Sequence, residues 1–175
     1  MTDQSIIDEL LRRKKAGTLK ADLTDTPCKI RPIAGGQIPK VESLLGYALP
    51  LLLTRMYTEV ANGGFGDSYG LLGLIGGSKN EAGFDSTSLL KELRKPDPDD
   101  RFWKWPDGLL PIGHLGCGMY HCVDSKSKRG KIILFEPNPH EDGRSWRDAF
   151  FPFSPSINKL ISDWLDGKDL WGGLA

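Results

Sequence analysis

Four residues in the second half of the chain could bind a metal ion, namely His114, Cys117, His121 and Cys122. Imidazole nitrogens and thiolate sulfurs are ligands that zinc prefers in proteins. The spacing argues against a zinc site, because it contains no Cys-x-x-Cys pair and because adjacent strand residues such as His121 and Cys122 point to opposite faces. All four side chains could reach one ion only across a β-bulge. Cysteines also serve as small buried apolar residues, and we expect that role here, with no bound metal or cofactor.

The same residues could form a thiol–imidazole pair, in which a histidine activates one of the cysteines as a nucleophile. Closeness in the sequence is the only support for such a pair, and the chain has no Gly-x-Ser-x-Gly elbow for a serine nucleophile. Carboxylates cluster at Asp97, Asp99 and Asp100 and again at Glu141 and Asp142, but in polar or proline-rich loops. Acid–base pairs need burial to separate their pKa values, so these are expected to be solvated surface groups. We therefore assign no catalytic residues and expect the chain not to be an enzyme.

Two glycine-rich stretches could bind phosphate, residues 63–66 (Gly-Gly-Phe-Gly) and residues 70–77 (Gly-Leu-Leu-Gly-Leu-Ile-Gly-Gly). Neither contains the Gly-Lys-Ser/Thr of a Walker loop, and neither follows a strand as Gly-x-Gly-x-x-Gly at the start of a helix. Gly63 and Gly64 come after a helical pattern, so their amides would not lie at the positive end of a helix. The sequence therefore predicts caps and tight turns at these glycines.

The composition is that of an ordinary soluble domain, with 175 residues of which 39% are hydrophobic and 26% charged. Lysine plus arginine equals aspartate plus glutamate at 23 each, so the chain lacks the basic surplus that binding to nucleic acid requires. No apolar stretch approaches the ~18 residues needed to cross a membrane, and the first residues do not resemble a secretion signal. With only three cysteines, we expect a cytoplasmic protein with reduced thiols.

Apolar periodicity predicts helices in the first half of the chain and strands in the second. A first helix with an apolar stripe at Ile6, Ile7, Leu10 and Leu11 stops at Gly17, and an irregular connector follows up to Pro39. Further helices are expected over residues 40–46, 50–61 and 86–94, and a last helix with Ser154 as its cap and Pro155 in its first position. Strands are expected at residues 69–75, 109–114, 118–124, 131–136 and 150–153.

This order of elements predicts an α+β fold, with a mostly antiparallel sheet flanked by helices in a single domain. Within the chain we distinguish an N-terminal helix and irregular connector, residues 1–37, from the main domain, residues 38–175. The first helix would then pack on the main domain as an appendage.

The residues expected to contact a protein partner are Asp97, Asp99, Asp100, Trp103 and Trp105. The segment Lys-Pro-Asp-Pro-Asp-Asp at residues 95–100 cannot form regular structure and must be a surface loop. The two tryptophans flank Lys104 and would share one face of an extended segment. Tryptophan is enriched in binding hot spots, although both residues could instead belong to the core.

Several motifs occur in an order that resembles the SUKH superfamily. They are, along the chain, Leu49-Pro50, Asn62-Gly63-Gly64-Phe65-Gly66, Leu109-Leu110-Pro111-Ile112, Gly116-Cys117-Gly118, Val123-Asp124 and Trp164-Leu165. Each motif alone is common, and it is the ordered set, over about residues 38–166, that carries the resemblance.

The resemblance implies an α+β fold, no catalytic activity and a role in binding other proteins. The superfamily includes fungal regulators of cell-wall synthesis and bacterial immunity proteins that neutralise a cognate toxin, often a nuclease. Its recurring residues, here Leu49, Pro50, Asn62, Gly63, Gly64 and Gly118, are implied to form turns and caps. Inhibitors of basic nucleases often carry an acidic excess that steers association, and this neutral chain has none.

Three hypotheses are open from the sequence. The first is an immunity protein, monomeric or weakly dimeric, that binds a cognate protein toxin. The second is a regulator or scaffold of cell-wall or envelope synthesis, with the N-terminal segment as its interaction segment. The third is a metal protein or thiol enzyme that uses His114, Cys117, His121 and Cys122. A bound toxin, bound cell-wall enzymes or a bound ion would distinguish them.

Overall fold

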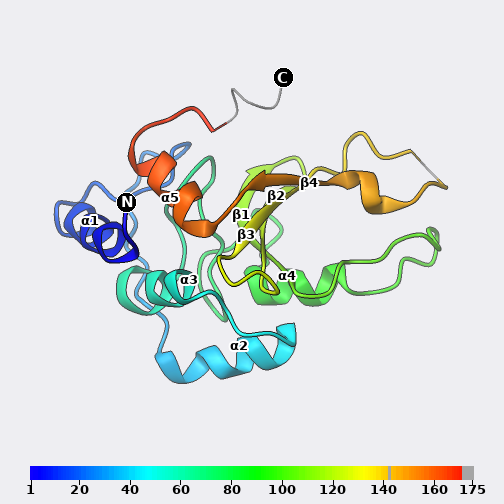
Figure 1. The fold of residues 1–175 in the computed structure, drawn as a ribbon, viewed down its shortest axis with the longest axis horizontal. Helices are drawn as coiled ribbons and strands as arrows, with labels where there is room; N and C mark the ends of the chain where they lie inside the picture. Colours follow the sequence, from blue (N-terminus) through cyan, green and yellow to red (C-terminus); the bar gives the residue numbers. More distant parts are fainter. Residues whose placement is uncertain (142, 171–175) are drawn as a thin grey trace.

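The computed structural model describes residues 1–141 and 143–170, in which helices flank a four-stranded sheet (Figure 1). The predicted α+β single-domain class is confirmed. Along the described chain the elements are α1 (Asp3–Lys15), η1 (Gly35–Gln37), α2 (Ile38–Leu45), α3 (Leu51–Arg55), η2 (Met56–Val60), α4 (Ser86–Leu93), β1 (Leu109–Gly116), β2 (Met119–Asp124), β3 (Lys131–Phe135), η3 (Trp146–Ala149), β4 (Phe150–Ser154) and α5 (Ile157–Leu165). Among these residues, no helix combines the length and the apolar character needed to cross a membrane.

The sheet is an antiparallel meander in the order β1-β2-β3-β4, and its strands lie at the four later strand patterns of the sequence. Two register shifts interrupt the pairing of β1 with β2, one before Gly113 and one after His114. Gly113 is needed at the first of them, because a Cβ atom there would lie 2.9 Å from Cβ of His121 on the neighbouring strand. The bulges bend β1 and bring these two strands into close contact.

The prediction of a strand at residues 69–75 is wrong. In this segment only Leu71 forms a bridge, with Gly113 of β1. The backbone turns at Gly70 and Gly76, which have positive φ angles of 87° and 71°, so no continuous ladder can form. The three leucines of the segment, Leu71, Leu72 and Leu74, are nevertheless buried, whereas Tyr69 and Ile75 are exposed. The apolar run in the sequence therefore indicated burial of its leucines but not a strand.

The helices are largely where the sequence predicted them, with corrections at two positions. The last helix begins at Ile157 with Ser156 as its cap, whose hydroxyl accepts a hydrogen bond from the Lys159 amide. Ser154 cannot cap it, because that residue ends β4 opposite Ile132 of β3. The helix expected over residues 50–61 changes at Met56 from α3 into the π-helix η2.

One hydrophobic core joins the sheet to helices from both ends of the described chain. Ile6, Ile7 and Leu10 of α1 belong to it and are no more than 1% exposed. In Figure 1, α1 lies beside α5 and above α3, at the end of the molecule opposite the loops that follow α4. The division of the chain after residue 37 stays a prediction, and α1 contributes to the same core as the sheet.

Candidate binding surfaces

The four residues considered for metal binding lie in different surroundings around the β1–β2 hairpin. Nε2 of His114 lies 2.8 Å from Oε2 of Glu81, and Cys117 is exposed on the hairpin turn. His121 and Cys122 are both buried on β2. Within residues 1–141 and 143–170, no three His, Cys, Asp or Glu side chains are placed to hold a metal ion together.

Burial sets the protonation states of the two β2 residues. It lowers the pKa of His121 to about 3 and raises the pKa of the Cys122 thiol. Near neutral pH the imidazole is therefore uncharged and the thiol protonated, whereas nucleophilic attack requires a thiolate. Desolvation also lowers the pKa of His114, against the opposing influence of Glu81. These surroundings favour structural roles for the histidines and for Cys122.

Two loops far apart in the sequence project together from one end of the molecule, beyond α4 and β4 (Figure 1). We call them the arm, comprising residues 95–104, 137–141 and 143–148. The rings of Trp103 and Trp146 meet edge-on with their centroids 4.8 Å apart. The His140 ring stacks on Trp146 at 3.7 Å. Aromatic contacts thus hold the two loops side by side.

Asp100, one of the residues predicted to contact a partner, joins the two loops of the arm. Its Oδ2 accepts a hydrogen bond of 2.6 Å from Nε1 of Trp146, and its Oδ1 accepts one from the Phe102 amide at 2.8 Å. Nε2 of His140 lies 3.8 Å from Oδ2. The hydrogen bond from Trp146, followed by that from Phe102, lowers the pKa of Asp100. Its carboxylate is therefore committed to contacts within the arm.

The two predicted tryptophans lie beneath the surface of the arm to different depths. Trp105 is 4% exposed, and its Nε1 donates to the carbonyl of Leu109 at 2.8 Å. Trp103 is half-buried, and its Nε1 donates to the carbonyl of Leu93 at 3.0 Å. Both indoles support the loops of the arm from below. They would therefore affect a partner mainly through the shape of the loops and less through direct contact with the rings.

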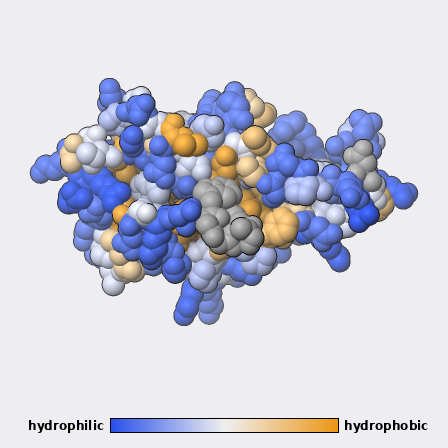
Figure 2. Space-filling model, turned by 90° about the horizontal axis from the view of Figure 1, so that it is seen from above, coloured by the Kyte–Doolittle hydropathy of each residue, from blue (hydrophilic) through white to orange (hydrophobic). Residues whose placement is uncertain are grey.

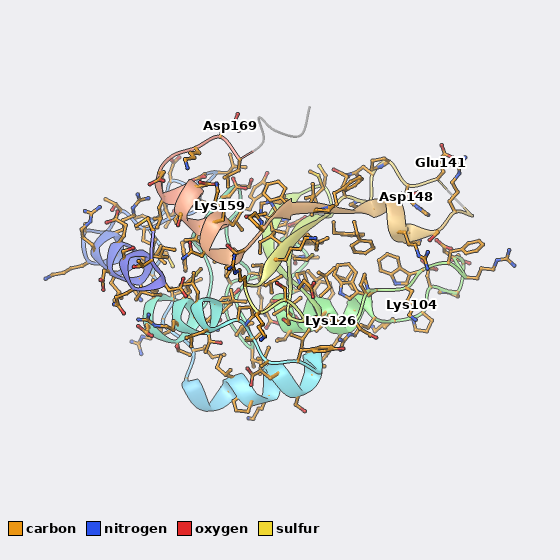
Figure 3. All side chains as sticks on the ribbon, in the orientation of Figure 1. Lys104, Lys126, Glu141, Asp148, Lys159 and Asp169 are labelled. Atoms are coloured by element: carbon orange, nitrogen blue, oxygen red, sulfur yellow. The ribbon has the colours of Figure 1, made fainter. Side chains whose placement is uncertain are left out.

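The exposed tip of the arm carries Asp97 and Asp99 together with one aromatic residue that the sequence did not single out. Phe102 is 39% exposed, and the Arg101 guanidinium lies over its ring, 4.8 Å from the centroid. Figure 2 shows a mostly hydrophilic arm on the face it presents. Both signs of charge occur there, since Lys104 lies on the same arm as the acidic residues Glu141 and Asp148 (Figure 3). Asp142, the remaining acidic residue of the second loop, lies outside the described residues.

Comparison with known proteins gives a family. The model of the SMI1 / KNR4 family (SUKH-1) matches residues 32–163, more than half of the chain. The chain belongs to this family. The SUKH resemblance drawn from the ordered motifs is confirmed, and the arm lies wholly within the matched residues. No curated protein matches the chain.

Residues 19–31 precede the stretch that matches the SUKH-1 family, and they are bound closely to it. We call this segment the strap. The Leu23 amide donates to the carbonyl of Ser68 at 2.8 Å. Gly64, in the Asn-Gly-Gly motif, is closely approached, because a Cβ atom there would lie 2.7 Å from Cδ1 of Ile30. Gly64 thus allows the strap to lie against the loop that follows η2.

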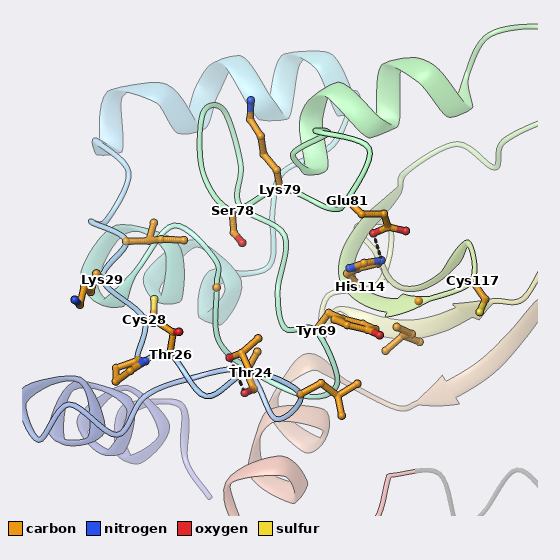
Figure 4. Close-up of a pocket in the computed structure, with 17 residues that line it drawn as sticks. Thr24, Thr26, Cys28, Lys29, Tyr69, Ser78, Lys79, Glu81, His114 and Cys117 are labelled. Carbon is orange, nitrogen blue, oxygen red and sulfur yellow. Dashed lines mark hydrogen bonds and ion pairs between the residues drawn. The ribbon is translucent and has the colours of Figure 1, made fainter.

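A groove of about 880 Å³ lies between the strap and the end of β1 (Figure 4). Its walls come from four segments: residues 21–30 of the strap, Gly64 and Tyr69, residues 78–81, and residues 114–117. The groove could not be predicted from the sequence, because its lining residues are scattered over nearly 100 positions and form no motif. Its position could be found only once the strap was placed.

Proposed function

We propose that this SUKH-1 family member is a non-catalytic protein-binding module that acts as an immunity protein, by binding and neutralising a cognate bacterial toxin. The observation that carries the proposal is membership of a family that includes immunity proteins. The proposal includes a cytoplasmic location and action as a monomer or weak homodimer.

We further propose that the partner binds at the arm. The arm projects from the body of the protein (Figure 1), and its tip presents Asp97, Asp99 and the half-exposed Phe102. Asp100 would contribute by accepting the hydrogen bond from Trp146 that joins the two loops of the arm. Trp103 and Trp105 would contribute by anchoring the base of the arm, because their indoles donate to the carbonyls of Leu93 and Leu109. A rigid scaffold below an exposed loop reduces the ordering cost of binding. The mixed charges of the arm fit a partner surface that also carries both signs.

The proposal is tested by capturing partners of the tagged full chain from its native cell lysate and identifying them by mass spectrometry. A stoichiometric toxin domain, inhibited by the purified chain in its own assay, is the expected result. Recovery of cell-wall or envelope enzymes without a toxin would instead support a regulatory or scaffold protein. An empty capture would contradict the immunity function.

Charge reversal at the arm then tests the binding surface. We expect Asp97→Lys to weaken toxin binding about tenfold. A charge at the edge of an interface steers association, and reversing its sign places like charges opposite each other. The matched control is Asp8→Lys, which makes the same change on α1, at the opposite end of the molecule (Figure 1). Equal binding by the two variants would remove the arm from the interface while leaving the immunity function itself untouched.

A further inference from the structure

The groove between the strap and β1 has the volume of a small-molecule site. Its volume of about 880 Å³ lies within the roughly 300–1,000 Å³ that ligand pockets span. We propose that this groove binds an uncharged, largely apolar small molecule with a planar ring. The site is separate from the arm, and half of it is built by residues that precede the family match.

The walls of the groove are fixed before any ligand arrives. The strap is bound to the body at both ends, with Asp22 donating its amide to the carbonyl of Gly66 at 3.0 Å and the carbonyl of Arg31 accepting from the Asn62 amide at 3.1 Å. Close packing adds to these bonds, because a Cβ atom on Gly70 would lie 2.8 Å from Cβ of Ala21. A preformed wall spares the ligand the cost of ordering it.

One wall presents an aromatic surface. The Tyr69 side chain is 49% exposed, and its ring lies against the His114 imidazole with centroids 4.9 Å apart. Gly116 makes room for this ring, since a Cβ atom there would lie 3.0 Å from Cε2 of Tyr69. The Tyr69 amide is also hydrogen-bonded to the carbonyl of His114 at 3.1 Å. A half-exposed ring held in this way is suited to stacking with a planar group.

The charges around the groove argue for an uncharged ligand. Figure 4 shows the ammonium groups of Lys29 and Lys79 pointing away from the space between the strap and Tyr69. The carboxylate of Glu81 is engaged with His114 at 2.8 Å. The Ser78 hydroxyl points into the groove in the same view and offers a neutral hydrogen-bonding group. Apolar side chains such as Leu23, which is 63% exposed, supply the remaining contact surface.

The inference is tested with N-phenyl-1-naphthylamine, an uncharged fluorescent molecule with planar rings, titrated into the full chain. We expect saturable binding at one site, with amide chemical shifts changing at Tyr69, Leu115 and Gly64. Tyr69→Ala should weaken binding about tenfold, through loss of the ring contact. Thr26→Trp, which places an indole on the strap wall, should weaken it at least as much by filling the groove.

The matched control is Thr18→Trp, the same change at an exposed position that does not line the groove. It should bind the probe as the unmodified chain does. Circular dichroism and thermal unfolding establish that each variant is folded before its affinity is interpreted. The inference is overturned if the probe does not saturate, if Thr26→Trp binds it with unchanged affinity, or if the shift changes map elsewhere, such as to exposed Phe151.

Discussion

At the residue scale, the histidines and cysteines show how far sequence reasoning extends. The alternating faces of a strand correctly separated His121 from Cys122, because adjacent strand residues point apart. Their burial on both faces of β2 was not predictable from that pattern, since it depends on what later packs against each face. His121 lies with its ring centroid 4.3 Å from that of Phe153 on β4, a contact between distant parts of the sequence.

The buried His121 predicts a loss of stability in acid. Burial lowers its folded-state pKa from the ordinary 6.5 to about 3, so the folded protein binds fewer protons than the unfolded chain between these values. Its contribution to stability is therefore complete above pH 6.5 and declines as the pH falls, by up to about 1.4 kcal/mol per pH unit. We expect His121→Leu to flatten this decline, as measured by denaturant unfolding from neutral pH to about pH 5.

The control for this prediction is Val123→Ala on the same strand. It removes buried apolar volume, so it should lower stability equally at every pH and leave the slope unchanged. An unchanged slope in His121→Leu would show that His121 titrates normally in the folded protein. The pH range of this measurement stays above the pH at which acidic groups begin to affect stability. Glu9 is an example, because hydrogen bonds from Arg12 and Arg13 lower its pKa to about 2.

At the scale of elements, periodicity located the helices better than their ends. Both Ser154 and Ser156 have a hydroxyl that can cap the last helix, and the sequence offers no local reason to prefer Ser156. The choice is made by β4, which extends as far as Ser154 to pair with β3. The apolar run at residues 69–75 does not form a strand for a similar reason. Its glycines turn the backbone beside the edge strand β1, so the segment cannot pair with that strand along its length.

The cap of α4 is expected to matter more than that of α5. Oδ1 of Asp85 accepts hydrogen bonds from the Ser88 amide at 2.8 Å and from Oγ1 of Thr87 at 2.7 Å, and its Oδ2 accepts one from the Gly76 amide at 2.9 Å. Although burial alone would raise the pKa of Asp85, these bonds lower it. We expect Asp85→Ala to cost roughly 2 kcal/mol of unfolding free energy, because buried donors lose their acceptor.

Ser156→Ala is the comparison for that prediction, since it removes one hydrogen bond, to the Lys159 amide at 3.0 Å. Its expected cost is about 1 kcal/mol, the usual value for a cap. Denaturant unfolding of both variants at neutral pH gives the two numbers. Equal costs would mean that the hydrogen bond which Asp85 accepts from the Gly76 amide contributes nothing to holding the loop before α4.

At the scale of the whole molecule, the sequence predicted the fold class and one loop of the arm, but neither the pairing of the two loops nor the groove. The acidic loop at residues 95–100 was recognised, yet its union with His140 and Trp146 depends on contacts about 40 residues apart. The sequence predicted an irregular connector before the main domain. That prediction describes the backbone of the strap but not its close packing against the Asn-Gly-Gly loop. Local patterns carry no information about such pairings.

Removal of residues 1–31 tests how the whole molecule depends on α1 and the strap. The deletion takes Ile6, Ile7, Leu10 and Leu19 out of the core, each at most 1% exposed. Burial of such side chains contributes roughly 1.5–3 kcal/mol apiece, and their sum is comparable with the net stability of about 5–15 kcal/mol of a typical domain. We expect the shortened chain to show no cooperative thermal unfolding transition.

A milder variant keeps this deletion interpretable. Ile6→Ala in the full chain should remain folded and lose about 2–5 kcal/mol, as measured by denaturant unfolding. If the shortened chain instead unfolds cooperatively at the temperature of the full chain, the predicted division after residue 37 would be supported as a true boundary.

The packing of α1 against α5 also bears on how the protein is made. Arg13 donates to the carbonyl of Leu165, 152 positions later, and Asn158 donates to Asp3. At roughly 5–20 residues per second, the ribosome makes Leu165 about eight to thirty seconds after Arg13. During that interval α1 cannot pack against α5. It can pack against η2, which is synthesised earlier than α5. We expect the nascent chain to be a client of ribosome-associated chaperones until α5 leaves the exit tunnel.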